Sequence, residues 1–240
     1  MSDPKPAELP PITIAIPIFP DVTQLDFTGP AQVLSRMGST TIKLVAATRD
    51  PVPTDSGFAA LPTHCLDEVD EATILCVPGG MGVTAALEDQ AMIAWTRRIA
   101  DRAEWVTAVC TGSLLLGAAG LLRGYRATTH WASHHLLEAF GAVPVKERVV
   151  FDRNRATGGG VTAGIDFGLA LVAAIRGEEH AKLVQLTLEY DPQPPFASGS
   201  PGEASAETRA RFDALTRRSG AERDARTRAA AARMEDVPNA

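Results

Sequence analysis

The chain has 240 residues, of which 45% are hydrophobic, and a formal net charge of −6. This length suits one or two domains with a sizeable core, and the acidic balance excludes the basic patch that nucleic-acid binding usually requires. No apolar run approaches the roughly 18 residues that are needed to span a bilayer. We therefore expect a protein with no nucleic-acid partner and no membrane partner.

The first residues, MSDPKPAELPP, lack the charged and apolar regions of a secretory signal, and we predict a disordered lead over residues 1–11. The three cysteines, Cys65, Cys76 and Cys110, show neither CxxC spacing nor a metal-ligand pattern. An odd number of cysteines without a signal indicates a reducing cytoplasm. Cys76 lies in the apolar run TILCVPGG and is interpreted as an inert core residue, and Cys65 as a small hydrophobe near a strand end or loop.

Apolar runs typical of strands buried on both faces recur along the first half of the chain. They cover residues 12–19, 41–48 and 72–80. The first strand is expected to bend or end at Pro17, which cannot donate a hydrogen bond to a neighbouring strand. Between the first two strands we predict a helix over residues 28–37, with Thr28 as its cap and Pro30 in its first turn.

The middle of the chain places a cysteine between a strand and a helix. Apolar positions at helical spacing predict a helix over residues 88–103, and the apolar run WVTAV predicts a strand that ends at Val109. A further helix is predicted over residues 113–119. Cys110 therefore lies at the joint between the strand and this helix.

The second half continues the alternation of strands and helices. We predict a short helix over residues 131–141 that ends at Gly141, a β arm over 143–152, a glycine-rich turn and long helix over 156–177, and a helix over 178–190. Strands that alternate with helices indicate an α/β fold with a mostly parallel central sheet flanked by helices.

The C-terminal part differs in composition from the rest of the chain. DPQPPFASGSPGE, rich in Pro, Gly and Ser, predicts an extended arm. The tail over residues 202–240 is rich in Ala and Arg, and its arginines are nearly matched by acids, so we predict a helix from about Ala204 to Met234. We expect this tail to pack on the domain or on a dimer partner.

Cys110 is the candidate nucleophile. Ligands of open α/β sheets bind beyond the carboxyl ends of the strands, which is where Cys110 is expected. The N–H groups and dipole of the following helix favour the thiolate form. Thr111 would place a hydroxyl beside the sulfur. The alternative is that a tight turn simply requires a small residue here.

Two other segments also lie at strand ends and could form part of a site, although no spacing rule brings them together with Cys110. Asp26 follows the first strand, but it could equally be an acid at a helix N-terminus. Gly79 and Gly80 end the strand before that of Cys110 and could form a backbone anion hole, or only a turn. His130 could be the base of a Cys/His pair, although a structural histidine is the better interpretation. The TGGG run, residues 157–160, favours close backbone approach over phosphate binding.

Five segments of the chain carry a family resemblance. They are, in order, LDFTGP, VPGG, AVCTGSLLLGAAGLLRGYRATTHW, TGGGVTAGIDFGLAL and LEYDPQPPFASGSP. Together they resemble the PfpI superfamily and, within it, the isonitrile hydratases. The resemblance runs from Ile12 to Pro201, which we interpret as a single α/β domain over residues 12–201.

The resemblance implies a flavodoxin-like sandwich, a homodimer and a cysteine at a strained strand-to-helix elbow, which falls on Cys110. The acidic partner of the sulfur falls on Asp26, and Thr111 after the nucleophile is hydratase-like. Gly79 and Gly80 match the backbone hole. The implied reaction hydrates an isocyanide to an N-substituted formamide through a covalent thioimidate on Cys110, with isocyanide and water as substrates and with neither metal nor organic cofactor.

Two other functions remain open from the sequence, and a third is disfavoured. A glyoxalase or deglycase of the same superfamily would use the same thiolate on an aldehyde. A non-enzymatic thiol sensor would exploit oxidation of the cysteine. Related domains also occur in transcription regulators, but about forty residues after Pro201 are too few for two helix-turn-helix units.

Overall fold

The computed structural model describes residues 9–235. Of the predicted lead, residues 1–8 lie outside the described residues, and residues 9–11 have no regular secondary structure. The first strand, β1, covers Ile12–Pro17. It ends at the proline, as its missing N–H predicts.

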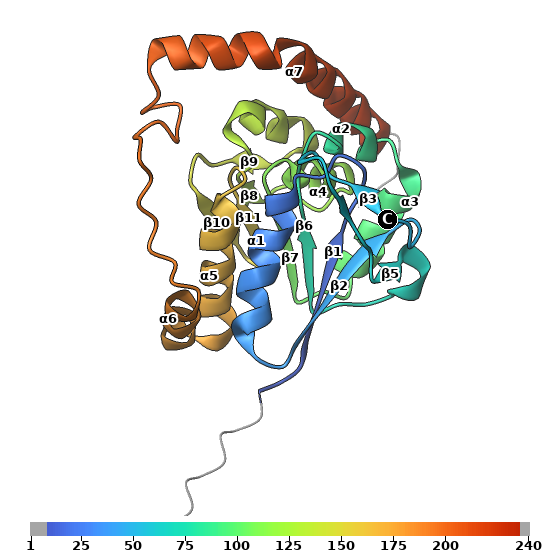
Figure 1. Ribbon diagram of the computed structural model, residues 1–240. Helices are drawn as coiled ribbons and strands as arrows, with labels where there is room; N and C mark the ends of the chain where they lie inside the picture. Colours follow the sequence, from blue (N-terminus) through green and yellow to red (C-terminus); the bar gives the residue numbers. More distant parts are fainter. Residues whose placement is uncertain (1–8, 236–240) are drawn as a thin grey trace, which may run out of the picture.

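A seven-stranded sheet forms the centre of the molecule, in the order β10-β11-β7-β6-β1-β2-β5 (Figure 1). Its neighbouring strands run parallel except for the antiparallel pair β10–β11, which confirms the predicted mostly parallel sheet. The remaining strands of this sheet are β2 (Thr40–Ala46), β5 (His64–Cys65), β6 (Ile74–Val77), β7 (Trp105–Val109), β10 (Val149–Asp152) and β11 (Arg155–Gly158). Two small sheets pair β3 (Val52–Pro53) with β4 (Ala59–Ala60), and β8 (Arg126–Ala127) with β9 (Val143–Pro144).

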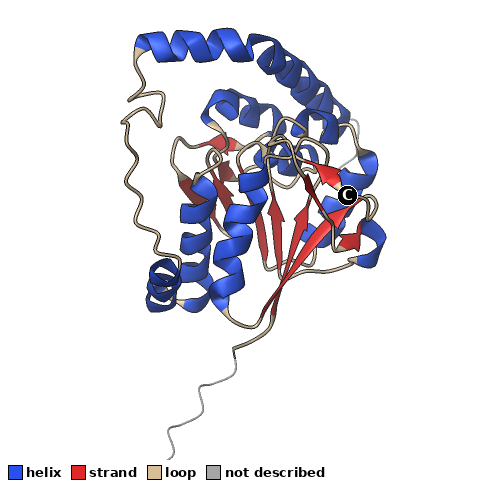
Figure 2. Cartoon of the chain, viewed as in Figure 1, coloured by secondary structure: helices blue, strands red, loops and turns tan. Residues whose placement is uncertain are grey.

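Helices cover both faces of the sheet (Figure 2). α1 (Gln24–Leu34) and α5 (Ala163–Arg176) lie side by side on one face, with α6 (Glu178–Thr187) against α5. α3 (Gln90–Ala100) and α4 (Gly112–Ala118) lie on the opposite face. The short helices are α2 (Val83–Ala86) and the 3-10 helices η1 (Ser35–Met37), η2 (Leu66–Glu68) and η3 (Trp131–Phe140).

The predicted start of the first helix is wrong. α1 begins at Gln24, four residues before the expected cap, so Pro30 lies inside the helix. The Thr28 hydroxyl donates to the carbonyl of Gln24 instead of capping the helix. A proline inside a helix removes one backbone hydrogen bond. Its ring packs on Gly164 of α5, where an added Cβ would lie 3.0 Å from the Pro30 ring.

The glycine-rich stretch also differs from its prediction. β11 takes up residues 155–158, so the long helix α5 begins only at Ala163. The reading of TGGG as a close backbone approach is confirmed, because a Cβ at Gly160 would lie 2.7 Å from the His130 ring. Gly141 ends η3 with a φ of 71°, as predicted for a helix stop.

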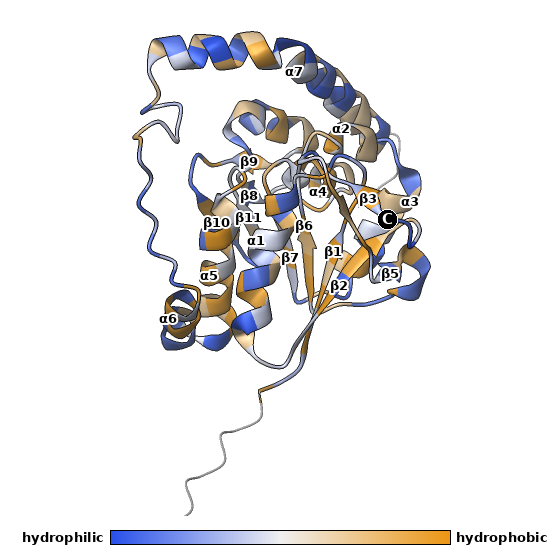
Figure 3. Cartoon of the chain, in the orientation of Figure 1, coloured by the Kyte–Doolittle hydropathy of each residue, from blue (hydrophilic) through white to orange (hydrophobic). Residues whose placement is uncertain are grey.

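The predicted C-terminal helix is present as α7 (Ala206–Glu235), and an exposed arm over residues 191–205 leads into it. α7 passes over α2, α4 and η3, above the carboxyl ends of the sheet strands (Figure 1). It is mainly hydrophilic, in contrast to the apolar central strands (Figure 3). The described part of the chain contains no helix with both the length and the apolar character of a bilayer crossing.

Candidate active site

The strand order brings three loops to one edge of the sheet. β1 pairs with β2 on one side and with β6 on the other, and β6 pairs with β7. After β1 the chain adds β2 on one side, and it later adds β6 and β7 on the other side, so the strand order reverses between β1 and β6. Ligands of doubly wound sheets bind at such a switch point. The segments that follow β1, β6 and β7 carry Asp26, Gly79 and Cys110, which explains why these distant residues meet.

Cys110 occupies a strained backbone position between β7 and α4. Its φ of 56° lies in the left-handed region, which a residue with a side chain rarely adopts. Its N–H donates to the carbonyls of Gly158 (3.1 Å) and Gly159 (2.9 Å), and its own carbonyl accepts from the Thr129 hydroxyl at 2.8 Å. These bonds hold the turn in place, and the side chain is left only 5% exposed.

Asp26 lies in the first turn of α1 and is fully buried. Its Oδ2 accepts a hydrogen bond from the Gly79 N–H at 3.0 Å, whereas Oδ1 has no hydrogen-bond partner among the described residues. Burial raises the pKa of Asp26 from 3.8 to about 7, and contact with the Cys110 thiol and the Gly79 N–H act in the opposite direction. The carboxyl is therefore able to hold a proton near neutral pH.

The pKa of the Cys110 thiol is raised to about 12 by burial and by the negative charge of Asp26. The N–H groups of Thr111 and Val161 act against this shift but are outweighed. The N–H at the start of the helix thus favours the thiolate, but burial has the larger effect on the pKa of the thiol.

The two glycines after β6 hold neighbouring groups in place. The Gly79 N–H is bonded to Asp26, and the Gly80 N–H donates to the Thr111 Oγ1 at 3.0 Å. The Thr111 hydroxyl in turn donates to the Gly80 carbonyl at 3.2 Å. Neither glycine N–H is free for an anion hole, and the hydroxyl proton of Thr111 is already used. The N–H groups that face the sulfur belong instead to Thr111 and Val161.

His130 lines the same pocket as Cys110 and begins η3, where its Nδ1 accepts a hydrogen bond from the Ala132 N–H at 3.3 Å. Burial and the charge of Arg223 lower the pKa of His130. Both effects disfavour the protonated form of this histidine. Its capping bond fits the structural interpretation, and its part in any chemistry stays a prediction.

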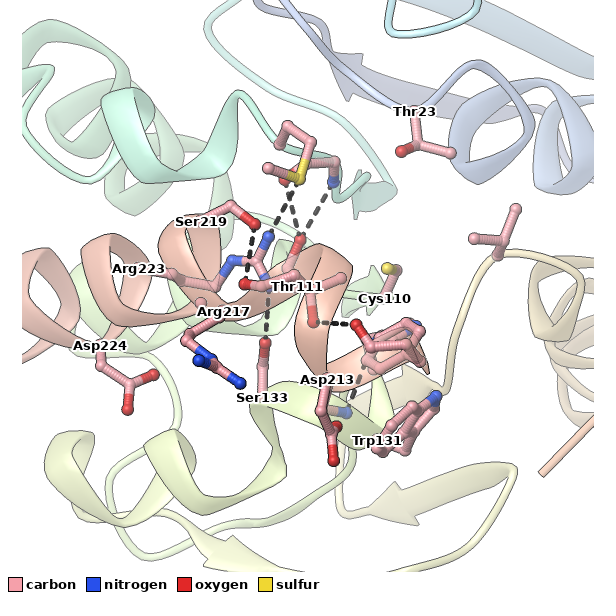
Figure 4. Close-up of a pocket in the computed structure, with 18 of the residues that line it drawn as sticks. Thr23, Cys110, Thr111, Trp131, Ser133, Asp213, Arg217, Ser219, Arg223 and Asp224 are labelled. Atoms are coloured by element: carbon pink, nitrogen blue, oxygen red, sulfur yellow. Dashed lines mark hydrogen bonds between the residues drawn. The ribbon is translucent and has the colours of Figure 1, made fainter. Parts of the chain in front are cut away.

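A pocket of about 460 Å³ opens above Cys110 and Thr111, and α7 forms its roof (Figure 4). The helix is fixed there by stacking of Phe212 on Trp131, with ring centroids 4.7 Å apart, and by ion pairs such as Arg226 with Glu88 at 2.9 Å. Five of the side chains that α7 contributes to the lining are Phe212, Asp213, Arg217, Arg223 and Asp224.

Sequence reasoning missed every one of these α7 residues. The tail shows no apolar stripe, and its charges recur all around the helix, so no residue stands out by type or spacing. Val161 and Met81 were also missed, because the loops that carry them have no motif that points to a site. The other two cysteines lie apart from the pocket lining, and Cys76 is fully buried, as predicted.

Known proteins resemble this chain over most of its length. The DJ-1/PfpI family model matches residues 12–174. An isonitrile hydratase of Pseudomonas putida is 50% identical over 193 residues, which cover 80% of this chain and 85% of that protein. The crystal structure of a ThiJ/PfpI family protein from Pseudomonas syringae has a TM-score of 0.90 at 41% identity, and the match covers 95% of this chain and 97% of that one. An HTH-type transcriptional regulator of Pseudomonas aeruginosa is 30% identical over 61% of this chain but only 44% of its own length.

Proposed function

This chain belongs to the DJ-1/PfpI family, and from that premise we propose that it hydrates isocyanides to N-substituted formamides, with Cys110 as the nucleophile. The likeness to the Pseudomonas putida isonitrile hydratase supports the substrate class. One observation carries the chemistry: a buried carboxyl with an unpartnered oxygen and a pKa near 7, Asp26, lies against the thiol at a strained elbow.

In the first half of the reaction the thiol adds across the isocyanide carbon. The proton of Cys110 passes to Asp26 as the sulfur forms a bond to the terminal carbon of R–N≡C. The protonated Asp26 then delivers that proton to the same carbon. The product is the thioimidate R–N=CH–S–Cys110, which retains every atom of the thiol and of the isocyanide.

In the second half water releases the product. The water oxygen attacks the thioimidate carbon while Asp26 takes a proton from the water. Asp26 then gives this proton to the thioimidate nitrogen. The C–S bond of the adduct R–NH–CH(OH)–S–Cys110 then breaks, its electrons stay on sulfur, and the hydroxyl proton returns to the thiol. The sum is R–NC plus water giving R–NH–CHO, with no oxidant, reductant or cofactor.

Thr111 and the two glycines act as positioning residues in this proposal. The loop of Gly79 and Gly80 fixes the Asp26 carboxyl and the first residue of the nucleophile helix relative to each other. The developing charge on sulfur is stabilised by the N–H groups of Thr111 and Val161.

We also propose that the protein acts as a homodimer in the cytoplasm. The three free cysteines fit a reducing compartment. The arm over residues 191–200 is exposed throughout, and Phe196 on it and Leu186 of α6 are each 78% exposed. Burial of these side chains against a second copy would remove apolar surface from water, which is favourable.

The proposal is tested by offering the protein one alkyl and one aryl isocyanide. Chromatography with mass detection is expected to show the matching formamides, and rapid-quench mass spectrometry an adduct on Cys110 whose added mass equals the whole isocyanide. Absence of formamide from both compounds would refute the activity. Formamide without any trapped adduct would count against the covalent route.

A further inference from the structure

The roof of the pocket contains a guanidinium whose hydrogen bonds are incomplete. Arg223 points from α7 into the pocket, where its Nη1 donates to the Ser133 hydroxyl at 3.2 Å and its Nη2 contacts the Met81 sulfur at 3.2 Å (Figure 4). Its Nε is buried without a hydrogen-bond partner among the described residues. Within residues 9–235, no carboxylate forms an ion pair with this arginine.

The unsatisfied side of this guanidinium has the geometry of a carboxylate site. Nε and Nη2 lie along one edge of the planar group, and such an edge binds a carboxylate through two parallel hydrogen bonds. At present that edge meets only the thioether of Met81, which is a weak acceptor on a flexible side chain. A buried donor without a partner costs free energy, so a ligand oxygen that reaches Nε would be favoured.

Two of the other charged side chains of the pocket have partners nearby. Asp224 bonds to His135 at 3.0 Å. Asp55 accepts hydrogen bonds from the hydroxyl groups of Thr23 and Ser56. Asp213 and Arg217 also line the pocket from α7, and no ion pair joins them within residues 9–235. Arg223 differs from Arg217 in its buried Nε, which has no hydrogen-bond partner in the described part of the chain, so its guanidinium is the group left for a ligand.

Arg223 is also not the counter-ion of the catalytic pair. The positive charge of Arg223 lowers the pKa of His130, in the same direction as burial. Arg223 is not among the causes of the pKa shifts of Asp26 and Cys110. Those shifts come from burial, from the interaction of the two groups and from backbone N–H groups, and Asp55 also raises the pKa of Asp26. Cys110 lines the pocket from the joint between β7 and α4, and Arg223 lines it from α7, so the sulfur and the guanidinium are two separate points of the same pocket (Figure 4).

We propose that Arg223 binds a carboxylate on the substrate, so that the preferred substrates are isocyanides that also carry an acidic group. This inference rests on the proposed function and specifies its substrate class. Met81 links the two points, because it contacts the guanidinium and directly follows Gly80, which bonds to Thr111 beside the nucleophile. A substrate held at both points would have its isocyano carbon over Cys110 and its carboxylate under α7.

The test compares two substrates of nearly the same shape, 4-isocyanobenzoate and the neutral 4-isocyanobenzamide. For the wild type we expect kcat/KM at least ~10-fold higher for the acid, which corresponds to about 1.4 kcal/mol. Arg223→Gln is expected to reduce this acid-to-amide ratio to about one. A purely structural role of Arg223 would lower both rates together and leave the ratio unchanged, which would overturn the proposal.

Two further variants act as controls. Arg223→Lys keeps the charge but loses the planar fork, and should give an intermediate ratio. Arg228→Gln removes an exposed arginine from the same helix, outside the pocket lining, and should keep the wild-type ratio. If Arg228→Gln lowered the ratio as much as Arg223→Gln, a general charge effect would replace the specific site.

A binding measurement separates this inference from the proposed function. Calorimetry compares 4-formamidobenzoate with 4-formamidobenzamide on the wild type and on Arg223→Gln, and requires no turnover. If neither isocyanide is hydrated, the proposed function fails, but tighter binding of the acid that is lost in Arg223→Gln still supports the carboxylate site. Equal binding of acid and amide to the wild type would overturn it.

Discussion

The backbone N–H of Gly79 donates to the Asp26 carboxylate across 3.0 Å, although the two residues are 53 positions apart in the chain. No side chain fits at this glycine, because a Cβ would lie 2.5 Å from the Thr111 nitrogen and 2.8 Å from Asp26 Oδ2. The loop after β6 is thus in tight contact with both the acid and the nucleophile elbow, and small changes in the carboxyl should have large effects on turnover.

Asp26→Asn is expected to reduce kcat/KM for an isocyanide by at least ~10²-fold, within the range that a proton-transfer group contributes. The amide fills the same space but cannot carry the proton between sulfur, carbon and water. Asp26→Glu keeps the carboxyl and moves it, so it should be impaired but active. Near-normal rates for both variants, measured as formamide release, would reduce Asp26 to an acid at a helix start.

The same substitution should change how stability depends on pH. The folded-state pKa of Asp26 is raised from 3.8 to about 7, so its stability contribution is complete below about pH 4 and is lost as pH rises to about 7. Asp26→Asn has no such loss. The advantage of the variant in unfolding free energy should therefore grow by up to about 4 kcal/mol between pH 4 and pH 8.

Urea unfolding at both pH values measures this difference. Asp101→Asn, which removes an exposed carboxyl, is the control. Its change in unfolding free energy relative to the wild type should be similar at the two pH values. An Asp26→Asn effect that is equally independent of pH would show that the carboxyl is not held in a costly buried environment.

Cys110→Ala and Cys110→Ser are expected to abolish formamide production while the fold is retained, as circular dichroism would show. Cys65→Ser should keep most activity, because the bond of Cys65 to Glu68 uses the backbone N–H. Cys76→Ser should also remain active, with some loss of stability because the side chain is fully buried in the core. Turnover by a folded Cys110→Ala protein would contradict the mechanism.

The sequence predicted the sheet and the position of Cys110 between a strand and a helix because both follow from local patterns. An apolar run that ends in Cys110 and is followed by small residues locates the elbow, and β7 and α4 lie within one residue of their predicted limits. The helix start at Gln24 could not be found in this way, because packing of Pro30 on α5 overrides the local preference.

The electrostatics of the site and its roof could not be predicted from local patterns. The raised pKa of Cys110 depends on burial by residues from several segments, whereas sequence reasoning had only the adjacent helix dipole. Likewise, the hydrogen bond of Arg223 to Ser133 joins residues 90 positions apart. Such contacts depend on how α7 crosses the fold, and the regular charge pattern of the tail contains no information about that crossing.

The oligomeric state offers a check that does not depend on activity. The monomer mass is 25.4 kDa, and we expect light scattering at micromolar concentration to give twice this value. The exposed Phe196 and Leu186 provide apolar surface for such an association. Phe196→Asp should shift the equilibrium toward the monomer, since burying a charge is unfavourable. A single 25.4 kDa species in the wild type would contradict the dimer.

The preference between isocyanides and aldehydes distinguishes the hydratase from a glyoxalase or deglycase. A thiol that adds to an aldehyde gives a hemithioacetal, and glyoxalase chemistry then needs a base to move a proton between carbons. A thiol that adds to an isocyanide gives a thioimidate, which needs a proton donor and a water. In the proposed mechanism Asp26, whose pKa is raised to about 7, supplies and accepts that proton near the sulfur.

Aspartate is also one methylene shorter than glutamate, and so leaves more room for water beside Cys110. We therefore expect kcat/KM for a small isocyanide to exceed that for methylglyoxal by at least ~10²-fold, a difference of about 2.7 kcal/mol in transition-state stabilisation. Parallel assays of formamide and of lactate formation measure the ratio, with Cys110→Ala as the blank for both. A larger kcat/KM for methylglyoxal would refute the proposed hydratase activity and leave only the family membership. Cys110 and Asp26 would then act on an aldehyde.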